Sequence, residues 1–267
     1  MTTAAVDAVR IIHEHMRSVM DQLTEADWDT PSGCAGWSVK DVISHVTSNQ
    51  KEMVDPTPPP AEPLPPMKAE EAMEALVAPR KDWAPADVRA EYDRYSAAWF
   101  GALDALQQEP MASTVAPIAD LGSYPLHSLA NAFAFDHYCH LRVDMLAPTG
   151  PLQVSLPEAT DAEVRPGIEW MLWGMPQMQA AELAAVVTQP LGLRLTGAGG
   201  GEWTVNPAGA DGLVTVTDGI GTVAATVESG AHAFVSWGTK RADWRASCSV
   251  TGDEAYAAAV LDTLNIV

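Results

Sequence analysis

The chain has 267 residues, of which 47% are hydrophobic, enough for one large domain or two of ordinary size. Its 35 acidic and 15 basic side chains give a formal net charge of -20, which argues against nucleic acid and anionic membrane surfaces as partners. The N-terminal residues lack the apolar core of a signal peptide, and no stretch approaches the roughly 18 apolar residues of a membrane span. We therefore expect a cytoplasmic protein, and its oligomeric state, monomer or dimer, stays open.

Four amphipathic segments in the first half are expected to form long helices. Apolar residues recur three and four positions apart in residues 3–24, 38–53, 86–106 and 126–146, with a shorter helix over 68–77. Ser38 and Asp41 have the spacing of a capping box, which predicts the start of the second helix. These segments predict an all-α bundle over about residues 1–147.

A proline-rich segment interrupts this helical pattern. Residues 55–67 contain seven prolines in thirteen positions, which excludes a helix interior or a central strand. A linker between domains would have the same composition. However, the helices that precede it could not bury their apolar stripes alone, so we interpret it as a loop inside the bundle.

The chain changes character near residue 150. A helical segment over 159–187 precedes four stretches, 191–197, 201–207, 212–218 and 221–230, in which apolar and polar residues alternate between glycine-rich turns. This pattern is typical of antiparallel strands, and a last helix follows Asp253. We therefore predict an α+β protein, with a helical domain over 1–150 and a small α+β domain with an antiparallel sheet over 151–267.

Polar residues in the fourth predicted helix could carry chemistry. Asp136 and His140 are four residues apart and so share one helix face. With His45 of the second helix they would provide two imidazoles and one carboxylate, a set that leaves coordination positions open, as in catalytic sites for zinc or a similar divalent ion. Ion pairs of Asp136 with His140 and of Arg142 with Asp144, or a buried polar network, would explain the same residues.

The three cysteines are expected to be free thiols. Cys34, Cys139 and Cys248 are too few and too widely spaced for a disulfide framework, and no two of them form a C-x-x-C pair.

A motif around His45 resembles a known family. The segment GCAGWSVKDVISHV, residues 33–46, is similar to the pattern C-x-G-W-[ST]-[VI]-x-D-[VI]-x-x-H of the mycothiol-dependent maleylpyruvate isomerase family, a DinB-like group of metal-binding four-helix bundles. The resemblance implies that His45 is a metal ligand, and that Asp136 and His140 match an acidic residue and a histidine that complete the ligand set. It also implies a helical bundle followed by a small α+β domain.

The C-terminal third resembles the same family. The segment ESGAHAFVSWGTKRADW, residues 228–244, is similar to a helix followed by W-x-G-R in that family. Thr239 and Lys240 separate Gly238 from Arg241, so the family's arginine is carried over to Arg241 across this insertion. Either Arg241 or Lys240 could bind a substrate carboxylate.

The resemblance also implies a reaction. A divalent ion, with zinc as the expected metal, would lower the pKa of the thiol of mycothiol. The sulfur would add to an activated double bond and leave again after rotation about the resulting single bond, which gives cis to trans isomerisation. Release of the adduct would instead be S-transfer. The expected substrate is a small unsaturated acid or electrophile, and the alternative is a non-catalytic protein that binds a metal or a small molecule on the same scaffold.

Overall fold

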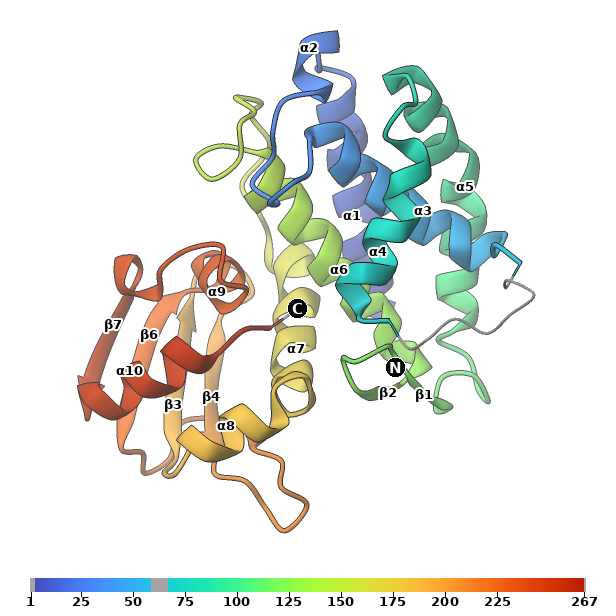
Figure 1. Ribbon diagram of the computed structural model, residues 1–267. Coiled ribbons are helices and arrows are strands. Elements are labelled where there is room, and N and C mark those ends of the chain that lie inside the picture. The colour runs from blue at the N-terminus through green and yellow to red at the C-terminus, as the bar shows by residue number, and fades with distance from the viewer. Residues whose placement is uncertain (1–2, 59–66, 267) are drawn as a thin grey trace. The chain divides into compact units, whose positions relative to one another are not determined.

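The computed structural model describes residues 3–58 and 67–266, which form two compact units, Met1–Glu158 and Ala159–Val267 (Figure 1). The first unit is mainly helical, and the second combines helices with a sheet. The predicted α+β fold class is therefore confirmed. None of the helices in the described ranges has the length and apolar character that crossing a membrane requires.

Four long helical segments dominate the first unit. The helix α1 packs against α5 and α6, and α3 packs against α5 and the shorter α4. Each long helix buries an apolar stripe in the shared core, as the three-and-four spacing predicts. The helical elements are α1 Thr3–Met20, α2 Glu25–Trp28, α3 Val39–Val54, α4 Ala69–Val77, η1 Ala78–Arg80, α5 Pro85–Ala105, η2 Leu126–Ser128, α6 Leu129–Cys139 and the π-helix η3 His140–Met145.

The start of α3 matches the predicted capping box. The backbone N–H of Asp41 donates to Ser38 Oγ at 3.2 Å, and the backbone N–H of Ser38 donates to Asp41 Oδ2 at 2.9 Å. Gly36, with φ of +83°, makes the turn before it, in a backbone region that favours glycine. The cap fixes where α3 begins, and therefore which side chains face the core two turns later.

The helix expected over 126–146 is divided into three parts, η2, α6 and η3. In the π-helical part, the backbone N–H of Leu146 donates to the carbonyl of Leu141, five residues earlier. The Asp144 carbonyl accepts a 2.7 Å hydrogen bond from the backbone N–H of Gly33 in the loop before α3. Such π-helical turns often lie at functional sites, and this one begins at a predicted ligand, His140.

Three further features of the first unit differ from the sequence prediction or lie outside the described residues. A short hairpin joins β1 Val115–Pro117 to β2 Ser123–Pro125. Residues 59–66, most of the predicted proline-rich loop, lie outside the described residues. The first helix ends at Met20, four residues earlier than predicted.

The second unit contains a five-stranded sheet with the order β5-β4-β3-β6-β7. Helices α9 and α10 pack against its strands, and Figure 1 shows α10 lying across the sheet. The expected single helix over 159–187 is interrupted at Gln179. The elements are α7 Asp161–Met178, α8 Ala180–Val186, β3 Leu191–Thr196, β4 Gly201–Asn206, β5 Thr215–Asp218, β6 Ala225–Gly230, α9 Ala231–Gly238, η4 Trp244–Ala246, β7 Cys248–Gly252 and α10 Glu254–Thr263.

The sheet is mixed, not entirely antiparallel as predicted. Strands β3 and β6 are parallel, with Leu193 opposite Val227, while the other neighbouring pairs are antiparallel. The chain between β5 and β6 passes over Gly192, where an added Cβ would lie 3.1 Å from a side-chain carbon of Ile220. Alternation of apolar and polar residues identifies strands but does not report their direction, which explains the error.

Candidate metal centre

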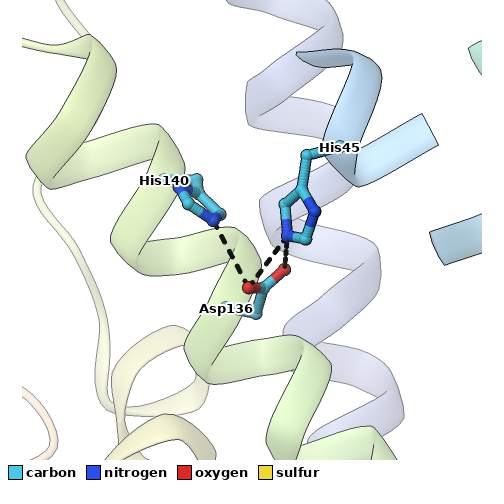
Figure 2. A group of neighbouring side chains, drawn as sticks. All are labelled: His45, Asp136 and His140. Carbon is cyan, nitrogen blue, oxygen red and sulfur yellow. Dashed lines mark hydrogen bonds and ion pairs between the residues drawn. The ribbon is translucent and has the colours of Figure 1, made fainter. Parts of the chain in front are cut away.

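His45, Asp136 and His140 meet inside the first unit. His45 comes from α3, Asp136 from α6 and His140 from the first position of η3, and each offers a ligand atom within 4.8 Å of the others (Figure 2). His45 Nε2 lies 3.2 and 3.1 Å from Asp136 Oδ1 and Oδ2, and His140 Nε2 lies 3.4 Å from Oδ1. The fold thus brings together the three residues that the sequence singled out, although 91 positions separate His45 from Asp136.

The two histidines are buried, and Asp136 is the most open of the three. The side chains of His45 and His140 are 3% and 8% exposed, against 28% for Asp136. Placing several polar groups here is costly unless they bind one another or an ion. The partly exposed carboxylate of Asp136 indicates that solvent reaches the cluster from this residue's side.

The charges of these residues are strongly coupled. Burial opposes ionisation of Asp136, but His45 and His140 outweigh it and hold the pKa of the Asp136 carboxyl well below its ordinary value. Burial also lowers the pKa of His140, but the charge of Asp136 and hydrogen bonds to Asp136 and Asp144 raise that pKa to about 9. Without a metal, His140 is therefore a cation at neutral pH beside an ionised Asp136.

Asp144 fixes the orientation of His140. Its Oδ2 lies 2.8 Å from His140 Nδ1, and its side chain is fully buried. A carboxylate there keeps a proton on Nδ1, so the Nε2 lone pair of the neutral ring is directed at Asp136 and His45. Asp144 was not assigned a role from the sequence. Arg142 Nη2 lies 3.4 Å from His15 Nδ1.

Asn49 is a second residue that the sequence analysis missed. It follows His45 by one helical turn on α3, and its Nδ2 lies 3.3 Å from Asp136 Oδ2 and 3.4 Å from His45 Nε2. The spacing of four residues after His45 could have identified it.

Trp37 covers the two imidazoles. Its indole ring lies 5.3 Å from the ring of His45 and 6.1 Å from that of His140, measured between centroids. Its Nε1 donates to Glu74 Oε2 of α4 at 2.6 Å, and Glu74 also pairs with Lys81. This half-buried indole gives the cluster one apolar side.

His137, between Asp136 and His140 in sequence, has a different environment. Burial lowers its pKa to about 3, and its ring packs against Trp99. Its Nε2 lies 3.7 Å from Asp136 Oδ2, beyond hydrogen-bonding distance. His137 is therefore a neutral neighbour of the cluster.

The predicted carboxylate-binding residues belong to the second unit. Lys240 Nζ donates to the backbone carbonyls of Leu261 and Asp262 at 3.1 and 2.8 Å, so it binds the end of α10. Arg241 follows it in the turn after α9, with an exposed side chain. Both residues are exposed, so neither is separated from a ligand by burial.

The donor set fits a divalent ion. Two imidazole nitrogens and a carboxylate oxygen match the ligands that zinc and related ions take in catalytic sites, and one helix pair supplies all three. Around such ions a carboxylate usually holds the second nitrogen of a ligating histidine, and Asp144 is placed to do so for His140.

Comparison with known proteins identifies the family of this chain. The sequence model of the mycothiol maleylpyruvate isomerase N-terminal domain matches residues 9–142, half of the chain, including all three candidate ligands. The chain belongs to this family. Among curated proteins, no sequence matches it.

Two crystal structures resemble this member of the mycothiol maleylpyruvate isomerase family over nearly its whole length. Both are of the mycothiol-dependent maleylpyruvate isomerase, one of them a histidine-to-alanine variant. The TM-score is 0.54 for each, the identities are 15% and 16%, and the alignments cover 94% of this chain and 96% of theirs. At this identity the similarity shows a shared fold, and the α+β architecture is common to all three.

Proposed function

We propose that this chain is a divalent-metal enzyme that uses the thiol mycothiol. Its reaction would be either the isomerisation of a small unsaturated acid or the transfer of the thiol sulfur to such an acid or another electrophile. The observation that carries the proposal is the convergence of His45 Nε2, the Asp136 carboxylate and His140 Nε2 at one point. Membership of the mycothiol maleylpyruvate isomerase family supports the choice of thiol and of substrate class.

The bound metal, which we expect to be zinc, would act as a Lewis acid and lower the pKa of a thiol. His45, Asp136 and His140 would hold it. To act as a ligand, His140 must lose the proton on Nε2. Its neighbours oppose this loss, because they raise the pKa of His140 to about 9. Asp144 then keeps the remaining proton on Nδ1.

Other residues would shape the site. The indole of Trp37 excludes water from the imidazole side, and a drier site strengthens electrostatic interactions. We propose that the guanidinium of Arg241 binds a substrate carboxylate, since its planar fork of donors suits one.

Metal content tests the first part of the proposal. Protein purified without chelators is expected to contain one equivalent of a divalent ion by elemental analysis. His45→Ala and His140→Ala should lose it, while His232→Ala, at an exposed histidine of the second unit, should retain it. Full metal content in the first two variants would contradict the assignment of the ligands.

Turnover tests the second part. The metal-loaded protein is expected to convert unsaturated dicarboxylic acids only when mycothiol is present. Chromatography of the products measures this conversion. Arg241→Ala should raise KM for acids more than it lowers kcat. Metal binding without turnover by any thiol would favour a binding protein on the same scaffold.

A further inference from the structure

We infer that Asn49 is a positioning residue of the metal centre, which holds one oxygen of Asp136 so that the other is presented to the ion. This inference rests on the proposed metal site and adds a fourth residue to it. Asn49 lies on α3, one turn after His45, and its amide nitrogen is within 3.4 Å of an atom of both His45 and Asp136.

The orientation of the Asn49 amide follows from its neighbours. An amide offers an N–H₂ donor at one end and a carbonyl acceptor at the other. The carboxylate of Asp136 accepts hydrogen bonds and repels a second oxygen, so the amide must turn its nitrogen toward Asp136 Oδ2, as it does at 3.3 Å.

The two oxygens of Asp136 consequently have different surroundings. Oδ1 lies between the two imidazoles, 3.2 Å from His45 Nε2 and 3.4 Å from His140 Nε2. Oδ2 also lies 3.1 Å from His45 Nε2, but it is the oxygen that Asn49 holds. Oδ1 is therefore the oxygen shared by both nitrogen ligands, and an ion placed among the three would take Asp136 through Oδ1 alone.

Single-oxygen binding has a chemical consequence. A carboxylate that binds through both oxygens fills two positions around an ion, whereas one that binds through a single oxygen leaves a position for water, thiol or substrate. By holding Oδ2 with a hydrogen bond, Asn49 favours binding through Oδ1 and so leaves that position to another ligand.

The test compares Asn49→Leu, which keeps the approximate size but removes every hydrogen bond, with the wild type. Asn49→Ala serves as a smaller replacement in case leucine disturbs the helix, and circular dichroism checks the fold of each. Lys51→Met is the matched control on α3, because the Lys51 ammonium binds Glu52 and Thr57.

Zinc affinity is measured by competition with a chromophoric chelator, and cobalt(II) provides a spectroscopic signature of coordination number. We expect wild type and Lys51→Met to bind alike, and both Asn49 variants to bind zinc roughly 10-fold to 100-fold more weakly, as for other groups that hold a ligand. The visible bands of cobalt(II) should weaken in the Asn49 variants, because a second carboxylate oxygen raises the coordination number.

The outcomes separate this inference from the proposed function. If wild type binds zinc and the Asn49 variants match it in affinity and in cobalt(II) spectrum, the positioning role is wrong and the proposed metal site stands. If wild type binds no divalent ion, both are wrong.

Discussion

Asp144 Oδ2 lies 2.8 Å from His140 Nδ1 inside a π-helical turn, and this contact joins an irregular piece of backbone to a candidate metal ligand. The carbonyl of the same Asp144 accepts from the backbone N–H of Gly33, in the loop that leads into α3. One residue thereby ties the loop before His45 to the orientation of His140.

Asp144→Asn tests the contribution of this charge. The amide keeps the size of the side chain but removes a full negative charge from the neighbour of His140. The pKa of His140 in metal-free protein should therefore fall from about 9 toward its ordinary value, and zinc affinity should fall about 10-fold. Histidine NMR titration and calorimetry measure the two effects, with the exposed Asp87→Asn as control. An unshifted His140 would show that Asp144 does not stabilise its charged form.

The pH dependence of metal binding follows from the same pKa. A metal binds the neutral imidazole, and metal-free His140 remains protonated up to about pH 9. Each unit of pH below 9 should therefore weaken binding about tenfold, and affinity should rise with pH and level off above 9. Calorimetry between pH 6 and pH 10 in buffers of different ionisation enthalpy would also count the released proton. Affinity that is flat from pH 7 to pH 9 would contradict the assignment of His140 as a protonated ligand.

Much of the first unit was predictable from residue spacing, because amphipathic helices place their buried residues three and four apart. The capping box was predictable from the spacing of Ser38 and Asp41 alone. The proximity of Asp136 and His140 was predictable from their shared helix face. The contact of His45 with Asp136 was not predictable in this way, since spacing within a helix does not report contacts between residues 91 positions apart. The resemblance to a family supplied that link.

The missed features have local physical reasons. Asp144 lies in a π-helical turn whose carbonyl at Asp144 accepts from Gly33, a contact with a distant part of the chain that spacing within a helix does not report. Strands β1 and β2 have only three residues each, too few for a visible alternation. The parallel pairing of β3 with β6 joins strands that are not consecutive in the chain, and alternation within each strand does not report it.

Trp37 should report metal binding by its fluorescence. The protein has nine tryptophans, but Trp37 lies 5.3 and 6.1 Å from the rings of the two candidate nitrogen ligands. Nickel(II) bound there should quench its emission, since quenching by paramagnetic ions decreases steeply with distance. We expect Trp37→Phe to lose most of the nickel-dependent quenching and Trp173→Phe, at a partly exposed tryptophan of the second unit, to retain it. Equal quenching in wild type and Trp37→Phe would place the ion elsewhere.

His13 should make the protein less stable in acid. It is buried, stacked on Tyr92 with ring centroids 4.6 Å apart, and burial followed by the charge of Arg17 lowers its pKa from 6.5 to about 4. The unfolded chain therefore binds a proton near pH 6.5 that the folded chain takes up only near pH 4, so acidification through this window favours unfolding.

His13 should contribute about 1.4 kcal/mol per pH unit to the loss of unfolding free energy between those values, and buried His137, with a pKa of about 3, should add a similar slope. His13→Gln should remove the first contribution, which urea unfolding at intervals from pH 8 to pH 4.5 would measure. At pH 8 both histidines are neutral in either state, so the variant's stability there sets the baseline for loss of packing. Parallel curves for wild type and His13→Gln across the window would show that His13 takes up its proton equally in both states.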